Sequence, residues 1–220
     1  SIVLNIDRDH LDYFKTMENL KHSFSKFCKK TTDMIIANGS DANTMEAVSA
    51  SGTAARVITF GKTAECDFYP ENIQHIADFR TEFDLMHHGE KLEHITIRVP
   101  GLHNVYNAVA ACAAAYSAGI PVEALRGGLD KFGGAMRRFE RLAEINGVTI
   151  VDDYAHHPAE IAATLKTAKE MSFKRVWAVH QPFTYSRTAM LLDEFASALS
   201  IADKVVLTEI MGSREKNTYN

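Results

Sequence analysis

Residues 148–161 read VTIVDDYAHHPAEI: an apolar run is followed by two acids, a tyrosine and two histidines, and then by a proline. The apolar run predicts a buried strand, and Pro158 is typical of the first turn of a helix, here expected over 158–171. The pattern continues downstream, because RVWAVHQ and KVVLTEI predict strands and residues 189–200 predict a helix. Alternating strands and helices predict an α/β fold with a parallel sheet.

Polar clusters follow the carboxyl ends of all three predicted strands. They read DDYAHHP at 152–158, HQPFTYSRT at 180–188 and TEIMGSRE at 208–215. Ligands of open α/β sheets bind at the edge where the parallel strands end. We therefore expect the three loops to converge on one crevice.

The preceding residues predict another domain of mixed helices and strands. Apolar residues have helical spacing over 11–30, and the segments DMIIANG and RVITFG read as strands around a short helix at 44–50. Short strands with polar breaks follow between 64 and 99. The alanine-rich stretch PGLHNVYNAVAACAAAYSAGI then predicts a helix closed by Gly119, and a shorter helix follows over 121–131.

A linker is expected in GGAMRRFERLAEING, where two glycines precede a basic cluster. We therefore predict two partial domains, 1–135 and 136–220. The strand already in progress at residues 2–6 and the polar ending REKNTYN indicate a piece of a longer protein.

The composition is that of an ordinary soluble globular protein, with 46% hydrophobic and 24% charged residues. A net charge of −4 argues against a broad basic face for nucleic acid or for an anionic membrane. We see no apolar run of membrane-spanning length, and hence expect no membrane insertion. Cys28, Cys66 and Cys112 are far apart and lack CxxC spacing, which favours a reducing, cytoplasmic compartment over a disulfide framework.

The DDYAHHP cluster has two interpretations. Taken alone, Asp152 or Asp153 has two equally good explanations. The acid is either there because it interacts favourably with the dipole of the following helix, or because it contacts a ligand. Tyr154, His156 and His157 need another reason, since a tyrosine ring can stack on a base and an imidazole can contact phosphate or carboxylate. A histidine pair also suggests zinc, but adjacent residues point in different directions and no HxxxH or HExxH motif accompanies them.

Arginines form the second group of candidates. Arg187 follows a predicted strand, and a guanidinium there can hold a carboxylate or phosphate through two hydrogen bonds. Arg137 and Arg138 stand at the expected domain junction, where clefts often bind ligands. A surface salt bridge is the alternative for each of the three.

The remaining candidates lie in the first domain. Asn104 and Asn107, beside His103, are three residues apart and share a helix face, and an amide offers the donor and acceptor that match an adenine edge. Helix capping is the alternative for Asn104. His10 lies between Asp9 and Asp12 after a predicted strand, and such a group can hold a divalent ion or its waters.

Taken in order, NIDRDHLDYF, VPGLHNVYNAVAA, FGGAMRRFE, VDDYAHHPAEI, QPFTYSRT and LTEIMGSREKN resemble the Mur ligases of bacterial peptidoglycan synthesis. Among these, the motifs are most similar to the members that add L-alanine to UDP-N-acetylmuramate. The resemblance implies the later part of a central ATPase domain followed by part of a Rossmann-like C-terminal domain. It also implies that the UDP-binding domain, the phosphate-binding loop and a magnesium-binding glutamate lie in missing domains of the same polypeptide, so these 220 residues are expected to be inactive alone.

The family's chemistry implies ATP and Mg²⁺, an acyl-phosphate of the UDP-N-acetylmuramate carboxylate, and attack on it by L-alanine. The resemblance implies roles for eight residues. His156 and Arg187 are expected to be the catalytic groups around the amino acid and the acyl-phosphate, and His10 a ligand of the second magnesium. The expected ATP contacts are Asn104, Asn107, Arg138, Tyr154 and, on the ribose, Asp153.

The sequence departs from the family pattern at one point. Many alanine-adding ligases read QPHRYSRT where this chain has Phe183 and Thr184, so one cation is lost and Arg187 is expected to carry more of the anion binding. Three alternatives stay open. They are a ligase that recycles a tripeptide onto the same UDP-sugar, a non-catalytic nucleotide-binding module, and a His/Asp metallohydrolase.

Overall fold

The computed structural model describes residues 1–76 and 79–218. The chain forms two compact units, Ser1–Gly133 and Gly134–Asn220. Each unit has a hydrophobic core of its own.

Unit 1 is built on a six-stranded sheet whose strands lie side by side in chain order. The strands are β1 (Ile2–Val3), β2 (Met34–Asn38), β3 (Arg56–Phe60), β4 (Phe68–Ile76), β5 (Arg80–His87) and β6 (Glu90–Ile97). Strands β1 to β4 pair in parallel, whereas β5 is antiparallel to both β4 and β6. Strand β6 therefore runs in the direction of β1–β4, and the loops after β1, β2, β3 and β6 leave the same edge of the sheet.

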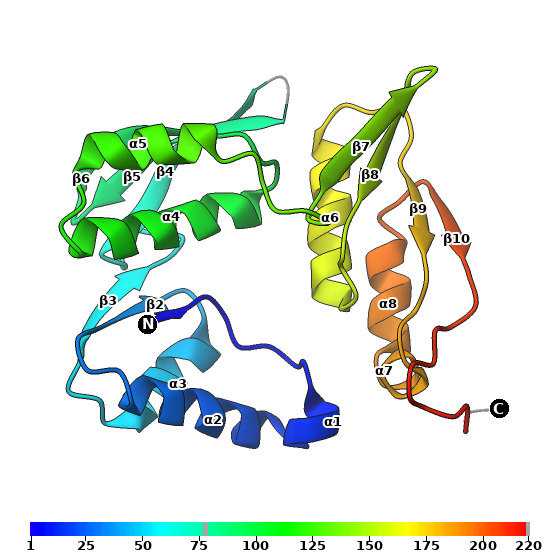
Figure 1. Cartoon of the computed structure of the whole chain (residues 1–220), viewed down its shortest axis with the longest axis horizontal. Helices are drawn as coiled ribbons and strands as arrows, with labels where there is room; N and C mark the ends of the chain where they lie inside the picture. The colour runs from blue at the N-terminus through cyan, green and yellow to red at the C-terminus, as the bar shows by residue number, and fades with distance from the viewer. Residues whose placement is uncertain (77–78, 219–220) are drawn as a thin grey trace. The chain divides into compact units, whose positions relative to one another are not determined.

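Helices cover both faces of this sheet (Figure 1). They are α1 (Leu11–Phe14), α2 (Met17–Lys29), α3 (Ala42–Ser51), α4 (Leu102–Ser117) and α5 (Val122–Lys131). Strand β2 serves both layers because successive side chains point to opposite faces. Ile35 and Ala37 pack in the cluster that contains α2 and α3 residues, and Ile36 packs in the cluster that contains α4 and α5 residues.

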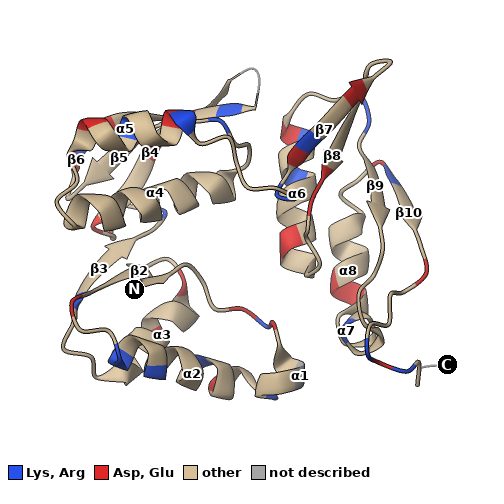
Figure 2. Cartoon of the chain, in the orientation of Figure 1, with Lys and Arg blue, Asp and Glu red and all other residues tan. Residues whose placement is uncertain are grey.

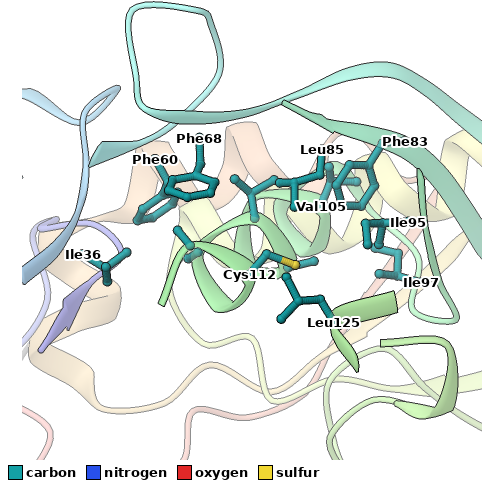
Figure 3. Close-up of a cluster of buried hydrophobic side chains, with 14 of the residues drawn as sticks. Ile36, Phe60, Phe68, Phe83, Leu85, Ile95, Ile97, Val105, Cys112 and Leu125 are labelled. Atoms are coloured by element: carbon teal, nitrogen blue, oxygen red, sulfur yellow. The ribbon is translucent and has the colours of Figure 1, made fainter. Parts of the chain in front are cut away.

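The larger core lies between β4–β6 and the alanine-rich helix α4 (Figure 3). Phe83, Leu85 and Ile95 are fully buried against it, and burial of a side chain of this size contributes about 1.5–3 kcal/mol. Small residues on α4 let the helix approach the sheet closely. Burial raises the pKa of the Cys112 thiol to about 12, so this cysteine stays protonated in the core.

The helix predicted over 11–30 is interrupted near its start. Lys15 has a positive φ of 69°, and the extended Thr16 accepts a hydrogen bond from the Asn19 backbone N–H at 3.2 Å. Thr16 is thus the N-cap of α2, and side-chain capping overrides the apolar periodicity that joined the two helices.

Unit 2 begins with an antiparallel hairpin of β7 (Glu140–Ile145) and β8 (Val148–Asp152). The predicted linker in 133–147 is therefore wrong in its second half, which is strand β7. Asn146 and Gly147 have φ of 51° and 78°, and two positive φ values are what a tight two-residue hairpin turn requires. The Asn-Gly pair was the signal for this turn.

The rest of unit 2 alternates helices and strands as expected. It contains α6 (Pro158–Glu170), β9 (Trp177–His180), α7 (Tyr185–Met190), α8 (Leu192–Leu199) and β10 (Lys204–Leu207). The helix predicted over 189–200 is in fact two, which meet at Leu191. Apolar residues of α6 and α8 bury one another in a cluster that includes Ile161, Leu165 and Phe195.

The strands of unit 2 are joined in two pairs. Strand β9 pairs in parallel with β10, whereas β8 pairs with β7. A cavity of about 650 Å³ is lined by residues of both β8 and β9, including Val151 and Trp177. His180 also lines it, and within the described part of the chain its buried Nε2 has no hydrogen-bond partner. Burial lowers the pKa of His180 and so favours its neutral form.

Charges of both signs are mixed along the surface elements. Figure 2 shows acidic and basic positions following one another on α5 and on the β7–β8 hairpin. This agrees with the small net charge of −4. Among the described residues, none of the helices has the length and apolar character needed to cross a bilayer.

Candidate functional site

The DDYAHHP loop is fixed by the first turn of α6. His157 is the N-cap, and its Nδ1 accepts a hydrogen bond from the Ala159 backbone N–H at 3.3 Å. In return, Glu160 Oε2 accepts the backbone N–H groups of His156 and His157 at 3.0 and 3.3 Å. This reciprocal arrangement satisfies donors that a helix start leaves unpaired, and it holds the loop against the helix.

Asp153 accepts hydrogen bonds from three different segments. Its Oδ1 accepts the Ala155 backbone N–H at 2.8 Å, and its Oδ2 accepts the Phe139 backbone N–H at 3.0 Å. The Thr164 hydroxyl, on helix α6, donates to the same Oδ2 at 3.0 Å. A carboxylate offers about four acceptor positions, so these bonds leave room for one further donor.

The turn at 137–139 is strained on both sides of Arg138. Arg137 and Phe139 have φ of 57° and 49°, values that non-glycine residues seldom adopt. Hydrogen bonds hold the turn in place: the Tyr154 N–H donates to the Arg137 carbonyl at 2.7 Å, and the Phe139 N–H donates to Asp153. Strain of this kind persists only where the surroundings determine the geometry, and it concentrates at functional sites.

These bonds bring three predicted site residues, Arg138, Tyr154 and His156, together around one aromatic ring. The guanidinium carbons of Arg137 and Arg138 lie 4.6 and 5.9 Å from the centre of the Tyr154 ring. His156 meets the ring edge-on with centroids 5.1 Å apart. Tyr154 is 49% exposed, so the ring is accessible. An accessible ring beside two cations suits a ligand that combines a flat base with phosphates.

The tautomer of His156 follows from its hydrogen bond. Its Nδ1 lies 2.9 Å from the Tyr154 carbonyl oxygen, which can only accept, so Nδ1 carries a hydrogen. In the neutral ring the lone pair is then on Nε2, which can take a proton from a substrate. The Glu160 carboxylate lies 3.6 Å from the same Nδ1.

The zinc alternative requires His156 and His157 to act together with a third ligand. The Nδ1 atoms of both histidines face backbone groups of the loop. Across residues 1–76 and 79–218, no cluster of three His, Cys, Asp or Glu side chains has the spacing of a metal site.

Arg187 lies in α7, half-buried, on the segment that follows β9. This segment is joined to the one that follows β10, because Phe183 pairs with Met211 and the Thr184 N–H donates to the Met211 carbonyl at 2.9 Å. Glu215 accepts both the N–H and the hydroxyl of Ser186, at 2.9 and 2.5 Å. These bonds, and the nearby Arg187 charge, lower the pKa of Glu215.

Asn104 and Asn107 form a linked pair at the start of α4. Asn104 donates to the Pro100 carbonyl at 2.7 Å, and its Oδ1 accepts from the Asn107 side chain at 3.3 Å. Asn104 thereby tethers the chain before the helix, although Gly101 is the N-cap. Asn107 is exposed, and its Oδ1 has no partner among the described residues. The free oxygen and the second N–H can recognise a base edge.

His10 lies in the loop that follows β1, at the sheet edge from which α4 also begins. The last residue of β2 and two side chains after it hold this loop: Asn38 donates to Leu4 O at 2.8 Å, Asp41 accepts from Ile6 N at 3.1 Å, and Asn43 donates to Ile6 O at 2.9 Å. His10 has a φ of 54°, and its side chain is 65% exposed with Nε2 3.4 Å from Asp9 Oδ2. The Asp12 side chain lies outside the described set.

Sequence reasoning missed several residues of these loops. Glu160 carried only half of a capping-box signal, because it stands three residues after the N-cap but the N-cap is His157 and not the usual Ser or Thr. No such signal marks Thr164, two turns into α6, or the three residues that hold the His10 loop, Asn38, Asp41 and Asn43. Their roles depend on contacts between segments that lie far apart in the sequence.

Family models match both units of the chain. Residues 1–115 match the Mur ligase middle domain, and residues 137–218 match the Mur ligase, glutamate ligase domain. Two curated relatives, the UDP-N-acetylmuramate–L-alanine ligases of Agathobacter rectalis and Lachnospira eligens, are each 45% identical to this chain, over 221 and 220 residues. These alignments cover 100% and 99% of this chain but 48% of each relative, so the chain spans about half the length of the curated relatives it matches.

Solved structures agree. UDP-N-acetylmuramate-alanine ligase MurC from Thermotoga maritima superimposes with a TM-score of 0.78 at 28% identity, covering 96% of this chain and 46% of that one. A murein peptide ligase from Psychrobacter arcticus gives a TM-score of 0.61 at 27% identity, covering 94% and 42% of the two chains. The α/β fold predicted from the sequence, with parts of a Mur-type middle and C-terminal domain, is thereby confirmed.

Proposed function

Because this chain belongs to the Mur ligase family, we propose that it is part of an ATP-dependent ligase that joins L-alanine to the carboxylate of UDP-N-acetylmuramate in peptidoglycan precursor synthesis. Relatives that are 40–45% identical along the chain are named for that reaction. The observation that carries the proposal is the Tyr154 ring with Arg138 and His156 beside it. The cytoplasm is the proposed compartment, and the three buried free cysteines fit its reducing conditions.

The chemistry requires two displacements. A carboxylate oxygen of the sugar attacks the terminal phosphorus of ATP and ADP leaves, and the alanine nitrogen then attacks the acyl carbon and phosphate leaves. The first step brings anions together, so cations must offset their repulsion. The second step needs an acceptor for the proton that the amine loses.

His156 and Arg187 are the residues proposed to act at the reacting groups. With its hydrogen on Nδ1, His156 presents a lone pair on Nε2 that can accept the amine proton. Arg187 supplies a guanidinium for the amino acid's carboxylate or for the acyl-phosphate. Phe183 and Thr184 add no charge to this segment, so Arg187 is proposed to carry more of the anion binding.

Five residues are proposed to contact ATP. Asn107, with Asn104 as its hydrogen-bonded neighbour, presents an amide for the adenine edge. Arg138 is proposed to contact the phosphates and Tyr154 to contact the nucleotide. Asp153 keeps one acceptor position for a ribose hydroxyl beside its three internal bonds.

His10 is proposed as a ligand of a magnesium ion that neutralises phosphate charge. Its exposed imidazole beside Asp9 fits that role only in part, because the described residues offer no group of three ligands. Magnesium usually keeps several waters and binds substrate phosphates, so one or two protein ligands are sufficient.

The test is a ligation assay on the natural polypeptide that carries these 220 residues. ADP release should require ATP, UDP-N-acetylmuramate and L-alanine together, and the product should contain one added alanine. A preference for a tripeptide over L-alanine would replace the proposal with the recycling reaction. ATP binding without turnover would leave only a nucleotide-binding module, and retention of about one zinc per chain after dialysis would support a metallohydrolase.

A further inference from the structure

The two loops proposed to contact the nucleotide are fastened to each other through one carboxylate. Asp153 belongs to the DDYAHHP loop and accepts the Phe139 N–H of the 137–139 turn. The turn returns a bond, since the Arg137 carbonyl accepts the Tyr154 N–H at 2.7 Å. The placement of Arg138 therefore depends on how the Asp153 side chain is oriented.

The orientation of Asp153 is set in turn by helix α6. The Thr164 hydroxyl donates to Asp153 Oδ2 at 3.0 Å, on the same oxygen that accepts Phe139 N–H. The helix fixes Thr164 more rigidly than a loop could, and a β-branched side chain has few rotamers there. Thr164 thus connects the regular structure of unit 2 to the irregular turn.

The strained backbone shows what this connection does. Positive φ at Arg137 and Phe139 is unfavourable for residues with a Cβ, so the turn would relax without external bonds. Phe139 is only 7% exposed, which adds packing to the hydrogen bond at one end of the turn. A second brace lies one helical turn earlier, where Glu160 Oε1 lies 3.6 Å from Arg138 Nη1.

We propose that Thr164 is a positioning residue for nucleotide binding. Through its bond to Asp153 it holds the strained 137–139 turn so that Arg138 faces the Tyr154 ring. Thr164 touches no substrate itself in this account. The inference rests on the proposed function for the identity of the nucleotide, whereas the relay from Thr164 to Phe139 stands on the geometry alone.

The experiment compares three variants of the natural polypeptide that carries this chain. Thr164→Val removes the hydroxyl at nearly constant shape, and Thr164→Ser restores it. Thr167→Val is the matched control, because Thr167 is also on α6 and its hydroxyl donates at 2.9 Å to the Ala163 carbonyl within the helix. If Thr164→Val does not fold, Thr164→Ala, which also lacks the hydroxyl, takes its place.

The expected result is a selective change in nucleotide affinity. Thr164→Val should raise KM for ATP roughly five- to tenfold, the effect of losing one hydrogen bond that orders a binding group. The KM for L-alanine should change by less than about twofold. Thr164→Ser and Thr167→Val should keep the wild-type KM for ATP. Equal KM values for ATP in wild type and Thr164→Val, or equal loss in Thr164→Val and Thr164→Ser, would overturn the proposal.

Amide hydrogen exchange separates this inference from the proposed function. The Phe139 N–H should be protected in the wild type and in Thr167→Val, and should exchange faster in Thr164→Val. If the wild type shows no ligation, the proposed function is wrong, but the exchange rates still test whether Thr164 holds Phe139 through Asp153. If ligation is present but Phe139 exchanges equally in all variants, the relay is wrong and the proposed function stands.

Discussion

Arg137 and Tyr154 are joined twice: the Tyr154 N–H donates to the Arg137 carbonyl at 2.7 Å, and the Arg137 guanidinium lies 4.6 Å from the centre of the Tyr154 ring. The backbone bond fixes the position of Tyr154, and the Arg137 guanidinium lies on one side of the Tyr154 ring. The rest of the ring remains accessible, since the residue is 49% exposed.

This relationship predicts that the ring, and not the hydroxyl, supports nucleotide binding. Tyr154→Ala should raise KM for ATP about tenfold, because stacking of a base on an aromatic side chain contributes about 1–3 kcal/mol. Tyr154→Phe should stay within about twofold of the wild type. Steady-state kinetics at saturating UDP-N-acetylmuramate and L-alanine would measure both. A large loss in Tyr154→Phe would instead assign the contact to the hydroxyl.

Asn107 provides a second test of nucleotide recognition. Asn107→Ala should weaken ATP binding roughly five- to thirtyfold, since it removes a donor and an acceptor from the exposed end of the amide pair. Binding of the UDP-sugar should change little. Calorimetric titration with each ligand would separate the two effects. Asn72→Ala, which deletes an exposed amide on the β4–β5 hairpin, serves as the control. Unchanged ATP affinity in Asn107→Ala would remove this residue from the site.

Asp84 should contribute stability that depends on pH. It accepts hydrogen bonds from Lys91, His94 and Asn72 at 2.6, 2.7 and 3.0 Å, and these bonds, that of Lys91 most of all, hold its pKa well below its usual range. Because the folded-state pKa is depressed, the contribution is fully present above the ordinary aspartate value of about 3.9 and is lost as pH falls further.

Asp84→Asn should therefore lower the free energy of unfolding by about 1–2 kcal/mol at pH 7. The difference from the wild type should shrink as the pH falls below about 4. Denaturant unfolding at several pH values between about 3 and 7 would measure the difference in free energy of unfolding. A difference that stays constant across that range would mean that packing, and not charge, accounts for the loss.

Two glycines should respond to alanine in opposite directions. Gly128 lies in α5, where an added Cβ meets no atom within 4 Å, so Gly128→Ala should stabilise the fold by about 0.5–1 kcal/mol. Gly147 also has open space around it, but its φ is +78°. Gly147→Ala should destabilise by about 1–2 kcal/mol. Thermal melts of the two variants would show shifts of opposite sign, and equal shifts would contradict the turn geometry described above.

Local sequence signals predicted most elements of the fold but few of their ends. The alternation around VTIVDDY and RVWAVHQ gave the α/β class, and the comparisons confirm it. The break at Thr16 was missed because a single capping hydrogen bond outweighs an apolar pattern that continues through it. Strand β7 differs from the prediction because the glycines and basic residues before it indicate a linker, whereas the Asn-Gly pair after it is a hairpin signal.

The sequence motifs predict individual site residues, but they do not predict how those residues are arranged in space. Motif order named His10, Asn107, Arg138, Asp153 and His156, and their roles remain predictions. Two of the three bonds to Asp153, those from Phe139 and Thr164, join segments separated by 14 and 11 residues in the sequence. Spacing alone does not reveal such contacts, because they depend on where strand β8 ends relative to helix α6.

The cavity between β8 and β9 also affects how the protein will behave in the laboratory. In the described part of the chain, β8 pairs only with β7 and β9 pairs only with β10, so one edge of each of these two strands has no strand beside it. Trp177 and Val179, on β9, are 58% and 71% exposed. Open strand edges with apolar neighbours are templates for pairing with other chains. Preparations limited to these 220 residues should therefore associate more strongly as concentration rises, and dilute samples with a mild solubilising additive are the conditions in which unit 2 can be studied as a monomer.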